Sequence, residues 1–161
     1  SYLPVSPTIA MGTGDFTIEG WFYLTAASSN YVRIFWQAVT GGNRMEWAFN
    51  DSGLGNTLYF SISSSTVTSS VTKASIQNTW THLAVVRSGT TVYMYKNGVS
   101  VGSGTISDSH GAQSLTIGCT YPVNTDYPYQ GYIDDLRITN GYCRYPGGTT
   151  FTPPTAAFPT Y

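Results

Sequence analysis

Apolar and polar residues alternate along most of this chain, and the alternation is clearest in the segment DFTIEGWFYL, residues 15–24. Successive side chains of an extended strand point to opposite faces, so Phe16 and Ile18 are expected on one face of this segment. The other face carries Glu19 and Trp21, so both faces hold large side chains. This pattern predicts a central strand of a sandwich whose second face is partly covered or lines a groove.

Other alternating runs predict further strands. In YVRIFWQAV, residues 31–39, the period of two places Val32, Ile34 and Trp36 on one face. The remaining strands are expected within the runs at 44–50, 57–63, 80–105, 114–118 and 129–139.

Turn signals between these runs indicate antiparallel connections. Asn97-Gly98 is the strongest of them, because both central residues of a type I′ hairpin turn need positive φ. Only residues 72–78 are expected to hold a single helical turn. Many short strands without helices predict an all-β fold, an antiparallel two-sheet β-sandwich of the jelly-roll type. We expect residues 1–161 to form a single domain, with the Pro-rich tail at 146–161 packed on the sandwich.

Composition supports β structure and narrows the range of partners. Charged residues make up only 9% of the chain, against roughly 25% in an average soluble protein. The 18 serines and 23 threonines supply the hydrophilic surface instead. A net charge of −1 with scattered basic residues disfavours nucleic acid, and the chain lacks the run of roughly 20 apolar residues that a membrane span needs. From the start at Ser1 rather than Met we expect either a processed chain or, as we favour, a piece of a longer polypeptide.

The chain has two cysteines, Cys119 and Cys143, which lack the CxxC spacing of zinc or redox sites. Both are expected near strand ends, so they could form one disulfide bridge. The alternative, which we favour, is two buried free thiols.

Five motifs, in their order and spacing, resemble a known family. They are GDFTIEGWFYL, NTWTHLAVVRSGTTVYMYKNGV, LTIG, GYIDDLRITNGYCRY and FTPPTAAFP. From about Asp15 onward the chain resembles the concanavalin A-like, laminin-G-like jelly-roll family, especially domains of bacteriophage structural and tail-associated proteins. The resemblance implies the sandwich fold and an extracellular or virion-surface location. It also implies an occasional calcium site, in which Asp134 would be the metal-binding acid.

The adjacent acids Asp134 and Asp135 are the first candidates for chemistry. Neighbouring strand residues point to opposite faces, so these carboxyls cannot flank one glycosidic bond at the roughly 5 to 9 Å that glycosidases require. One acid could instead bind calcium, pair with Arg137 or accept hydrogen bonds from buried backbone N–H groups. His82 and His110 have no second His or Cys at ligand spacing, and Asp108-Ser109-His110 is too contiguous to form a nucleophile–base arrangement. The other acids form no run at i, i+2 and i+4 on one strand, so we expect no enzymatic activity.

Glycan sites combine an aromatic ring, which faces the C–H side of a sugar, with polar groups that bind its hydroxyls. Two segments of the chain have this mixture. The expected loop at 120–132 offers Tyr121, Asn124, Asp126, Tyr127 and Tyr129. The run at 44–50 offers Arg44, Glu46 and Trp47. In the alternative interpretation, the tyrosines pack on the sandwich edge or on another subunit, and Trp47 packs in the core.

The combined features predict a non-catalytic, carbohydrate-binding, lectin-like adhesion domain of a larger viral or phage surface protein. Its partners would be a glycan or cell-surface polysaccharide and other virion proteins. The alternative is a structural or protein–protein interaction module of a virion with no glycan ligand. A glycoside hydrolase or lyase is a third hypothesis, because the fold has hosted such enzymes.

Overall fold

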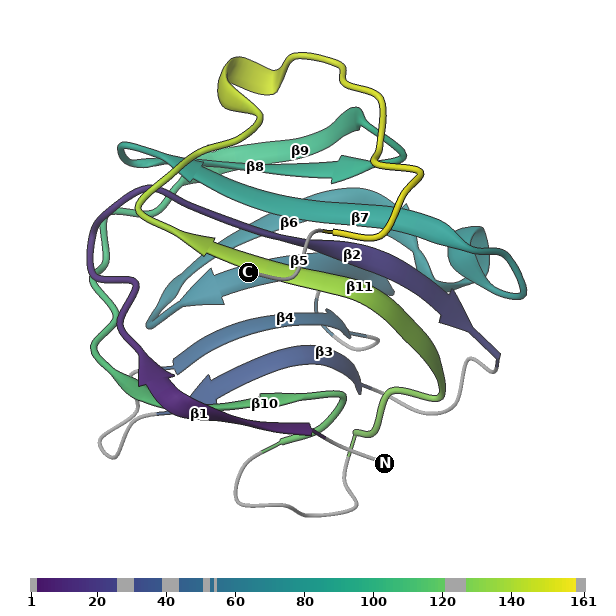
Figure 1. Cartoon of the computed structure of the whole chain (residues 1–161), viewed down its shortest axis with the longest axis horizontal. Coiled ribbons are helices and arrows are strands. Elements are labelled where there is room, and N and C mark those ends of the chain that lie inside the picture. Colours follow the sequence, from purple (N-terminus) through teal and green to yellow (C-terminus); the bar gives the residue numbers. More distant parts are fainter. Residues whose placement is uncertain are drawn as a thin grey trace.

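The computed structural model describes residues 3–25, 31–38, 44–50, 53, 55–120 and 127–158. Its strands form two antiparallel sheets that stack face to face, so the predicted two-sheet sandwich is confirmed (Figure 1). No helix within the described ranges is long and apolar enough to cross a membrane. The larger sheet has the strand order β1 (Leu3–Ile9), β10 (Gln113–Ile117), β3 (Tyr31–Ala38), β4 (Arg44–Asn50), β5 (Thr57–Ile62), β6 (Ser65–Thr72). The smaller sheet has the order β11 (Gly131–Asn140), β2 (Phe16–Leu24), β7 (Thr81–Ser88), β8 (Thr91–Lys96), β9 (Val99–Thr105).

The predicted turn and helical turn are both present. Asn97 and Gly98 have φ values of 50° and 79° and connect β8 to β9, as a type I′ turn requires. The short 3-10 helix η1 (Lys73–Ile76) lies within the segment expected to hold one helical turn. A second one, η2 (Pro146–Gly148), lies near the C-terminus. Strand β6 was not predicted, because its core-facing positions include Ser69 and small hydroxyl residues hide the apolar period.

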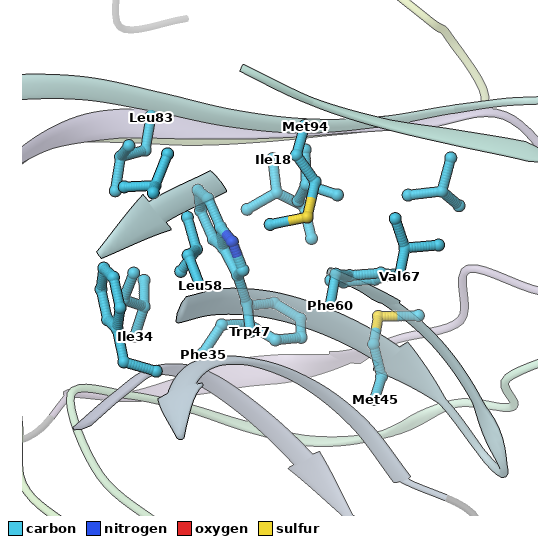
Figure 2. Packing of buried hydrophobic residues seen from close by; sticks show 14 of the residues in the cluster. Ile18, Ile34, Phe35, Met45, Trp47, Leu58, Phe60, Val67, Leu83 and Met94 are labelled. Atoms are coloured by element: carbon cyan, nitrogen blue, oxygen red, sulfur yellow. The ribbon is translucent and has the colours of Figure 1, made fainter. Parts of the chain in front are cut away.

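The apolar faces of the two sheets meet in a continuous core (Figure 2). Ile18, Phe22 and Trp47 are completely buried there. The indole of Trp47 meets the edge of the Phe22 ring, with 5.5 Å between centroids and 82° between planes. Full burial of a large apolar side chain stabilises the folded state by about 2 kcal/mol. The alternating pattern predicted the fold because its apolar positions are those buried between the two sheets.

Strand β3 departs from strict alternation. Its register with β4 shifts between Arg33 and Phe35, and Ile34 and Phe35 are both buried. A bulge of this kind turns the following side chains to the other face. Trp36 therefore lies with Arg33 on the outer face, 4.2 Å from its guanidinium carbon to the ring centroid. The expectation that Trp36 shares a face with Val32 and Ile34 was wrong.

Strand β11, which overlaps the run at 129–139 where a strand was predicted, is the edge strand of the smaller sheet. Between Asp134 and Arg137 it carries a bulge, which places two residues opposite Gly20 of β2. A Cβ on Gly20 would lie 3.2 Å from the Leu136 Cα, so glycine lets the bulge pass close to β2. Asp135 has a φ of 47°, outside the extended region. The argument that Asp134 and Asp135 point to opposite faces, which assumed a regular strand, therefore does not hold.

The C-terminal segment, residues 141–158, covers part of the outer face of the smaller sheet (Figure 1). The rings of Tyr145 and Phe151 stack at 3.5 Å between centroids, and Tyr95 of β8 donates its hydroxyl to the Tyr145 carbonyl. The amide of Phe151 donates to the Gly98 carbonyl, 3.0 Å away. A Cβ at Gly98 would overlap the Phe151 carbonyl oxygen, so only glycine lets the segment cross this turn. This cover explains why strand β2 carries large side chains on its outer face as well as on its core face.

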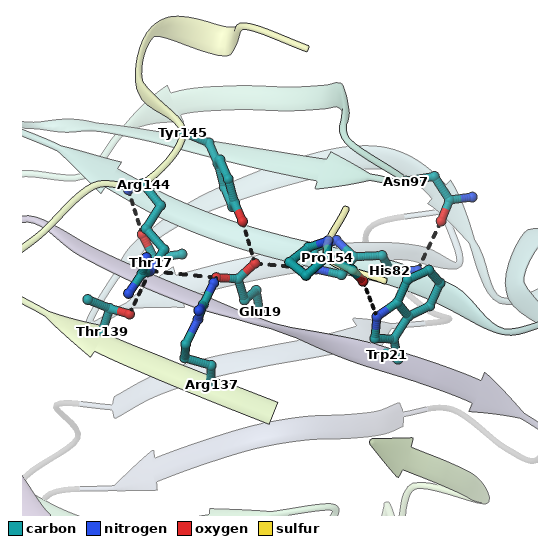
Figure 3. Close-up of polar contacts among 10 residues, drawn as sticks. All are labelled: Thr17, Glu19, Trp21, His82, Asn97, Arg137, Thr139, Arg144, Tyr145 and Pro154. Carbon is teal, nitrogen blue, oxygen red and sulfur yellow. Dashed lines mark hydrogen bonds and ion pairs between the residues drawn. The ribbon is translucent and has the colours of Figure 1, made fainter. Parts of the chain in front are cut away.

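A buried carboxylate, Glu19 of β2, connects this segment to the sheet (Figure 3). Its Oε1 accepts hydrogen bonds from Arg137 Nη2 at 2.6 Å and Nε at 3.0 Å. Its Oε2 accepts the Tyr145 hydroxyl at 2.7 Å and lies 3.3 Å from His82 Nε2. Burial alone would raise the pKa of Glu19, but its contacts with His82, Tyr145 and Arg137 outweigh burial and hold that pKa below its ordinary value.

Both cysteines are buried and free, as we favoured. Burial raises the pKa of the Cys119 and Cys143 thiols. Both thiols therefore stay protonated and unreactive near neutral pH.

We predict that Glu19→Gln lowers the free energy of unfolding by about 2 kcal/mol at neutral pH, because it removes the charged acceptor of Arg137. Since the folded-state pKa of Glu19 is depressed, its contribution is complete above the unfolded pKa of about 4.5. It is lost as pH falls through the folded pKa. Urea unfolding at a series of pH values should therefore show a smaller acid-induced loss of stability in the variant than in the wild type.

The matched control is Asp134→Asn, measured in chelator, which removes an exposed carboxylate from the same sheet. We expect it to change stability by less than about 0.5 kcal/mol. Identical pH profiles for Glu19→Gln and the wild type would contradict the assigned role of Glu19.

Candidate functional site

An open cavity of about 320 Å³ lies on the outer face of the larger sheet, opposite the sheet that carries the C-terminal segment. Strands β3 to β6 supply most of its lining, and Tyr127 adds a side chain from outside the strands. The lining residues are Tyr31, Arg33, Arg44, Glu46, Asn50, Tyr59, Thr66 and Tyr127.

Strand register explains how these side chains come together. Arg33 of β3 pairs with Ala48 of β4, and Ala48 pairs with Tyr59 of β5, so the three form one cross-strand row. Glu46 precedes Ala48 by two residues on the same face of β4. Ala48 lies between Arg33 and Tyr59 in this row, and both of those side chains interact with Glu46.

Glu46 is the centre of the polar lining, and its side chain is only 3% exposed. Its Oε2 accepts a hydrogen bond from Arg33 Nε at 3.3 Å, and its Oε1 accepts one from Arg44 Nε at 2.9 Å. The Ser61 hydroxyl donates to Oε1 at 3.5 Å. A buried carboxylate is costly unless it is paired and hydrogen-bonded, and these partners meet that need.

The hydroxyl of Tyr59 also bonds to Glu46. Burial, followed by the charge and hydrogen bond of Glu46, raises the pKa of Tyr59 well above its ordinary value. Tyr59 is therefore a neutral hydroxyl in the cavity.

Aromatic rings surround Arg33. Its guanidinium carbon lies 5.6 Å from the Tyr31 ring centroid, 4.2 Å from that of Trp36 and 5.0 Å from that of Tyr127. Its Nη1 donates to the Thr120 hydroxyl. Cation–π attraction to these rings and the hydrogen bond to Thr120 stabilise the position of the guanidinium, so Arg33 forms a well-held part of the cavity wall.

Tyr127 is held by backbone and ring contacts. Its carbonyl accepts a hydrogen bond from the Arg33 amide at 3.2 Å, and its ring meets that of Tyr31 edge-on at 4.9 Å between centroids. Its φ is 61°, which is unusual for a bulky side chain. Such conformations persist where the surroundings over-determine them, and they cluster at ligand sites.

The structure unites parts of the two segments that were predicted as separate candidate sites. Arg44 and Glu46 from the first segment and Tyr127 from the second line the same cavity. Tyr121, Asn124 and Asp126 lie outside the described residues.

Two predicted site residues belong to the core instead. Trp47 has no exposed surface, and Tyr129 is buried with its ring 6.2 Å from that of Phe22. A buried ring cannot stack on a sugar, so we remove both from the candidate site. Trp47 points inward because it lies one position from Glu46 on a regular strand.

Sequence reasoning missed Tyr31, Arg33 and Tyr59 as site residues. Each occupies an outward position of an alternating run, so strand periodicity could have indicated its face. It could not have indicated that this face is the one left open to a ligand.

Asp134, the predicted calcium ligand, is exposed on the other sheet, and its Oδ1 accepts a hydrogen bond from the Asp135 amide at 2.9 Å. Arg137, which the sequence offered as its ion-pair partner, binds Glu19 instead. Within the described part of the chain, no group of three His, Cys, Asp or Glu side chains is placed to hold a metal ion. Calcium binding at Asp134 stays a prediction.

A laminin G family model, described as the concanavalin A-like lectin/glucanases superfamily, matches residues 1–143. The chain therefore belongs to this superfamily, as the two-sheet sandwich also indicates. Most of the C-terminal segment that covers the smaller sheet lies beyond the matched residues.

Several solved structures have a similar fold. Domains LG4-5 of the mouse laminin alpha1 chain are 13% identical, with a TM-score of 0.66, over 97% of this chain and 45% of that chain. Domain 4 of AbnA, an extracellular arabinanase from Geobacillus stearothermophilus solved with arabinotriose, is 22% identical, with a TM-score of 0.61, over 83% and 63%. A putative carbohydrate binding protein from Bacteroides ovatus is 18% identical, with a TM-score of 0.64, over 86% and 40%.

The TM-scores show a shared fold, and at identities this low they show the fold alone. The chain spans less than two thirds of the length of each of these three chains. Curated proteins gave no sequence match.

Calcium binding at Asp134 predicts a higher melting temperature in calcium than in chelator, because a ligand that binds only the folded state stabilises it by mass action. Differential scanning fluorimetry measures this difference. Asp134→Asn should abolish it, whereas Asp135→Asn, which tolerates the positive φ, should retain it. Equal wild-type melting temperatures in both buffers would rule out the calcium site.

Proposed function

We propose that this protein is a non-catalytic glycan-binding domain and that its ligand occupies the cavity on the outer face of the larger sheet. The observation that carries the proposal is the lining itself, in which tyrosine rings stand beside guanidinium, carboxylate, amide and hydroxyl groups. Sugar rings offer C–H groups to aromatic faces and hydroxyls to polar side chains. Cavities of this size class, with a few convergent polar groups, commonly bind small ligands.

The wall of the cavity is pre-organised for such a ligand. Arg33 is held by Glu46 and by aromatic rings, and Tyr127 is held by Tyr31 and by the Arg33 amide. The Tyr127 side chain remains at the cavity, with 36% of the residue exposed. Side chains fixed before binding lose little conformational entropy when a ligand arrives, which favours affinity.

Carboxylate placement supports binding rather than hydrolysis. Glycosidases use two carboxyl groups, one on each side of the scissile bond. Among the described lining residues, Glu46 is the one acid, and it is engaged by Arg33 and Arg44. The described lining therefore does not supply the pair of carboxyl groups that hydrolysis uses.

Two structural relatives add support. One domain of this fold was solved with arabinotriose, and another is described as a putative carbohydrate binding protein. We further propose, from the resemblance to phage domains, that this domain acts outside the cell or on a virion surface as an adhesion module. The competing hypothesis is a virion module that binds only protein.

We predict that Tyr127→Ala weakens glycan binding about tenfold, because it removes an exposed ring from the cavity, and leaves the melting temperature nearly unchanged. Tyr129→Ala should instead lower the free energy of unfolding by about 3 kcal/mol, because its ring fills the core. A glycan array, run once with calcium and once with chelator, would identify the ligand, and titration calorimetry would compare the variants.

Tyr132→Ala is the matched control, since Tyr132 is an exposed tyrosine on the opposite sheet. It should bind as the wild type does. An array without binding under either condition would contradict the glycan hypothesis and favour the protein-binding module.

A further inference from the structure

The described lining of the cavity carries more positive than negative groups. Its described lining residues include two guanidinium groups, Arg33 and Arg44, and one carboxylate, Glu46. The whole chain has a net charge of −1. The positive character is therefore local to the cavity and does not reflect a basic protein.

Glu46 does not oppose an incoming anion strongly, because its charge is already compensated. Each of its oxygens accepts a hydrogen bond from a different arginine, and the Tyr59 hydroxyl binds it as well. Its side chain is almost completely buried behind these groups. An entering ligand would therefore meet the arginines before it meets the carboxylate.

The two arginines have different surroundings. The side chain of Arg33 is 11% exposed, and aromatic rings and Thr120 surround its guanidinium. The side chain of Arg44 is 48% exposed, and its Nε donates to Glu46. The bond from Nε to Glu46 orients the Arg44 guanidinium, and the half-exposed side chain lines the cavity. Arg44 is therefore the group best placed to meet an anionic ligand.

Resting on the glycan-binding function above, we propose that the cavity selects sugars that carry a carboxylate, such as uronic or sialic acids, and that Arg44 pairs with this group. The planar guanidinium edge matches the two oxygens of a carboxylate and can bind both at once. Tyr127 and Tyr31 stand beside the arginines and would contact the sugar ring. Arg33 adds positive potential without direct exposure.

The test compares sugars that differ in one charge. Titration calorimetry would measure 3′-sialyllactose against lactose, and α-1,4-trigalacturonate against its methyl ester. We expect the acidic member of at least one pair to bind about tenfold more tightly than its neutral counterpart. Added salt should reduce this preference, because Arg44 is half exposed and screening acts on exposed charges.

Variants assign the preference to a residue. Arg44→Gln should bring the affinity for the acidic sugar down to that for the neutral one, and Arg44→Lys should keep part of the preference. Arg144→Gln removes the same charge from the C-terminal segment, outside the cavity, and should leave the preference intact. Circular dichroism would verify that each variant is folded.

The outcomes separate this proposal from the function on which it depends. Binding of neutral glycans with no preference for acidic ones would overturn the proposal and leave the glycan-binding function standing. Equal binding of 3′-sulfolactose and 3′-sialyllactose would overturn the assignment to a carboxylate. An unchanged preference in folded Arg44→Gln would overturn the role of Arg44. No binding to any array glycan would overturn both the function and its charge selectivity.

Discussion

The architecture of this protein depends on one buried carboxylate, Glu19, on the outer face of the smaller sheet. A carboxylate without exposed surface is tolerated only when charged and hydrogen-bonding partners surround it. Arg137 of the edge strand and Tyr145 of the C-terminal segment meet this requirement. Because those partners come from sequence more than a hundred residues away, satisfying Glu19 closes this face of the sandwich. The open cavity lies on the outer face of the other, larger sheet.

That open face uses the same chemistry in a different environment. Glu46, like Glu19, is buried and paired with arginines, and a tyrosine hydroxyl binds each of them. At Glu19 the stacked pair of Tyr145 and Phe151 lies nearby, so the cluster serves the attachment of the C-terminal segment. At Glu46 the surrounding groups face a cavity. Similar polar clusters thus stabilise one face and form a binding surface on the other, and the covering segment makes the difference.

Much of the fold could be predicted, because strand periodicity and turn chemistry are local. The alternation around Phe16 and the Asn97-Gly98 hairpin agree with the structure, as does the turn at η1. Strand β6 was missed because small hydroxyl residues hide its apolar period, whereas the wrong predictions about Trp36 and the Asp134–Asp135 pair both lie at β-bulges. Bulges in β3 and β11 altered the face of Trp36 and the geometry at Asp134, and no local pattern of side chains indicated them.

The candidate site could be predicted only in part. Residue type indicated Arg44, Glu46 and Tyr127, because aromatic and charged groups suit sugars wherever they occur. Sequence could not place Tyr127 beside Arg33, since their contact depends on how separate strands and a connecting segment meet. By itself, the sequence determined the sandwich, its turns and the chemical groups available, because these depend on neighbouring residues. Tertiary structure alone decided which face is covered and which aromatic rings are exposed, because burial results from contacts between segments distant in the chain.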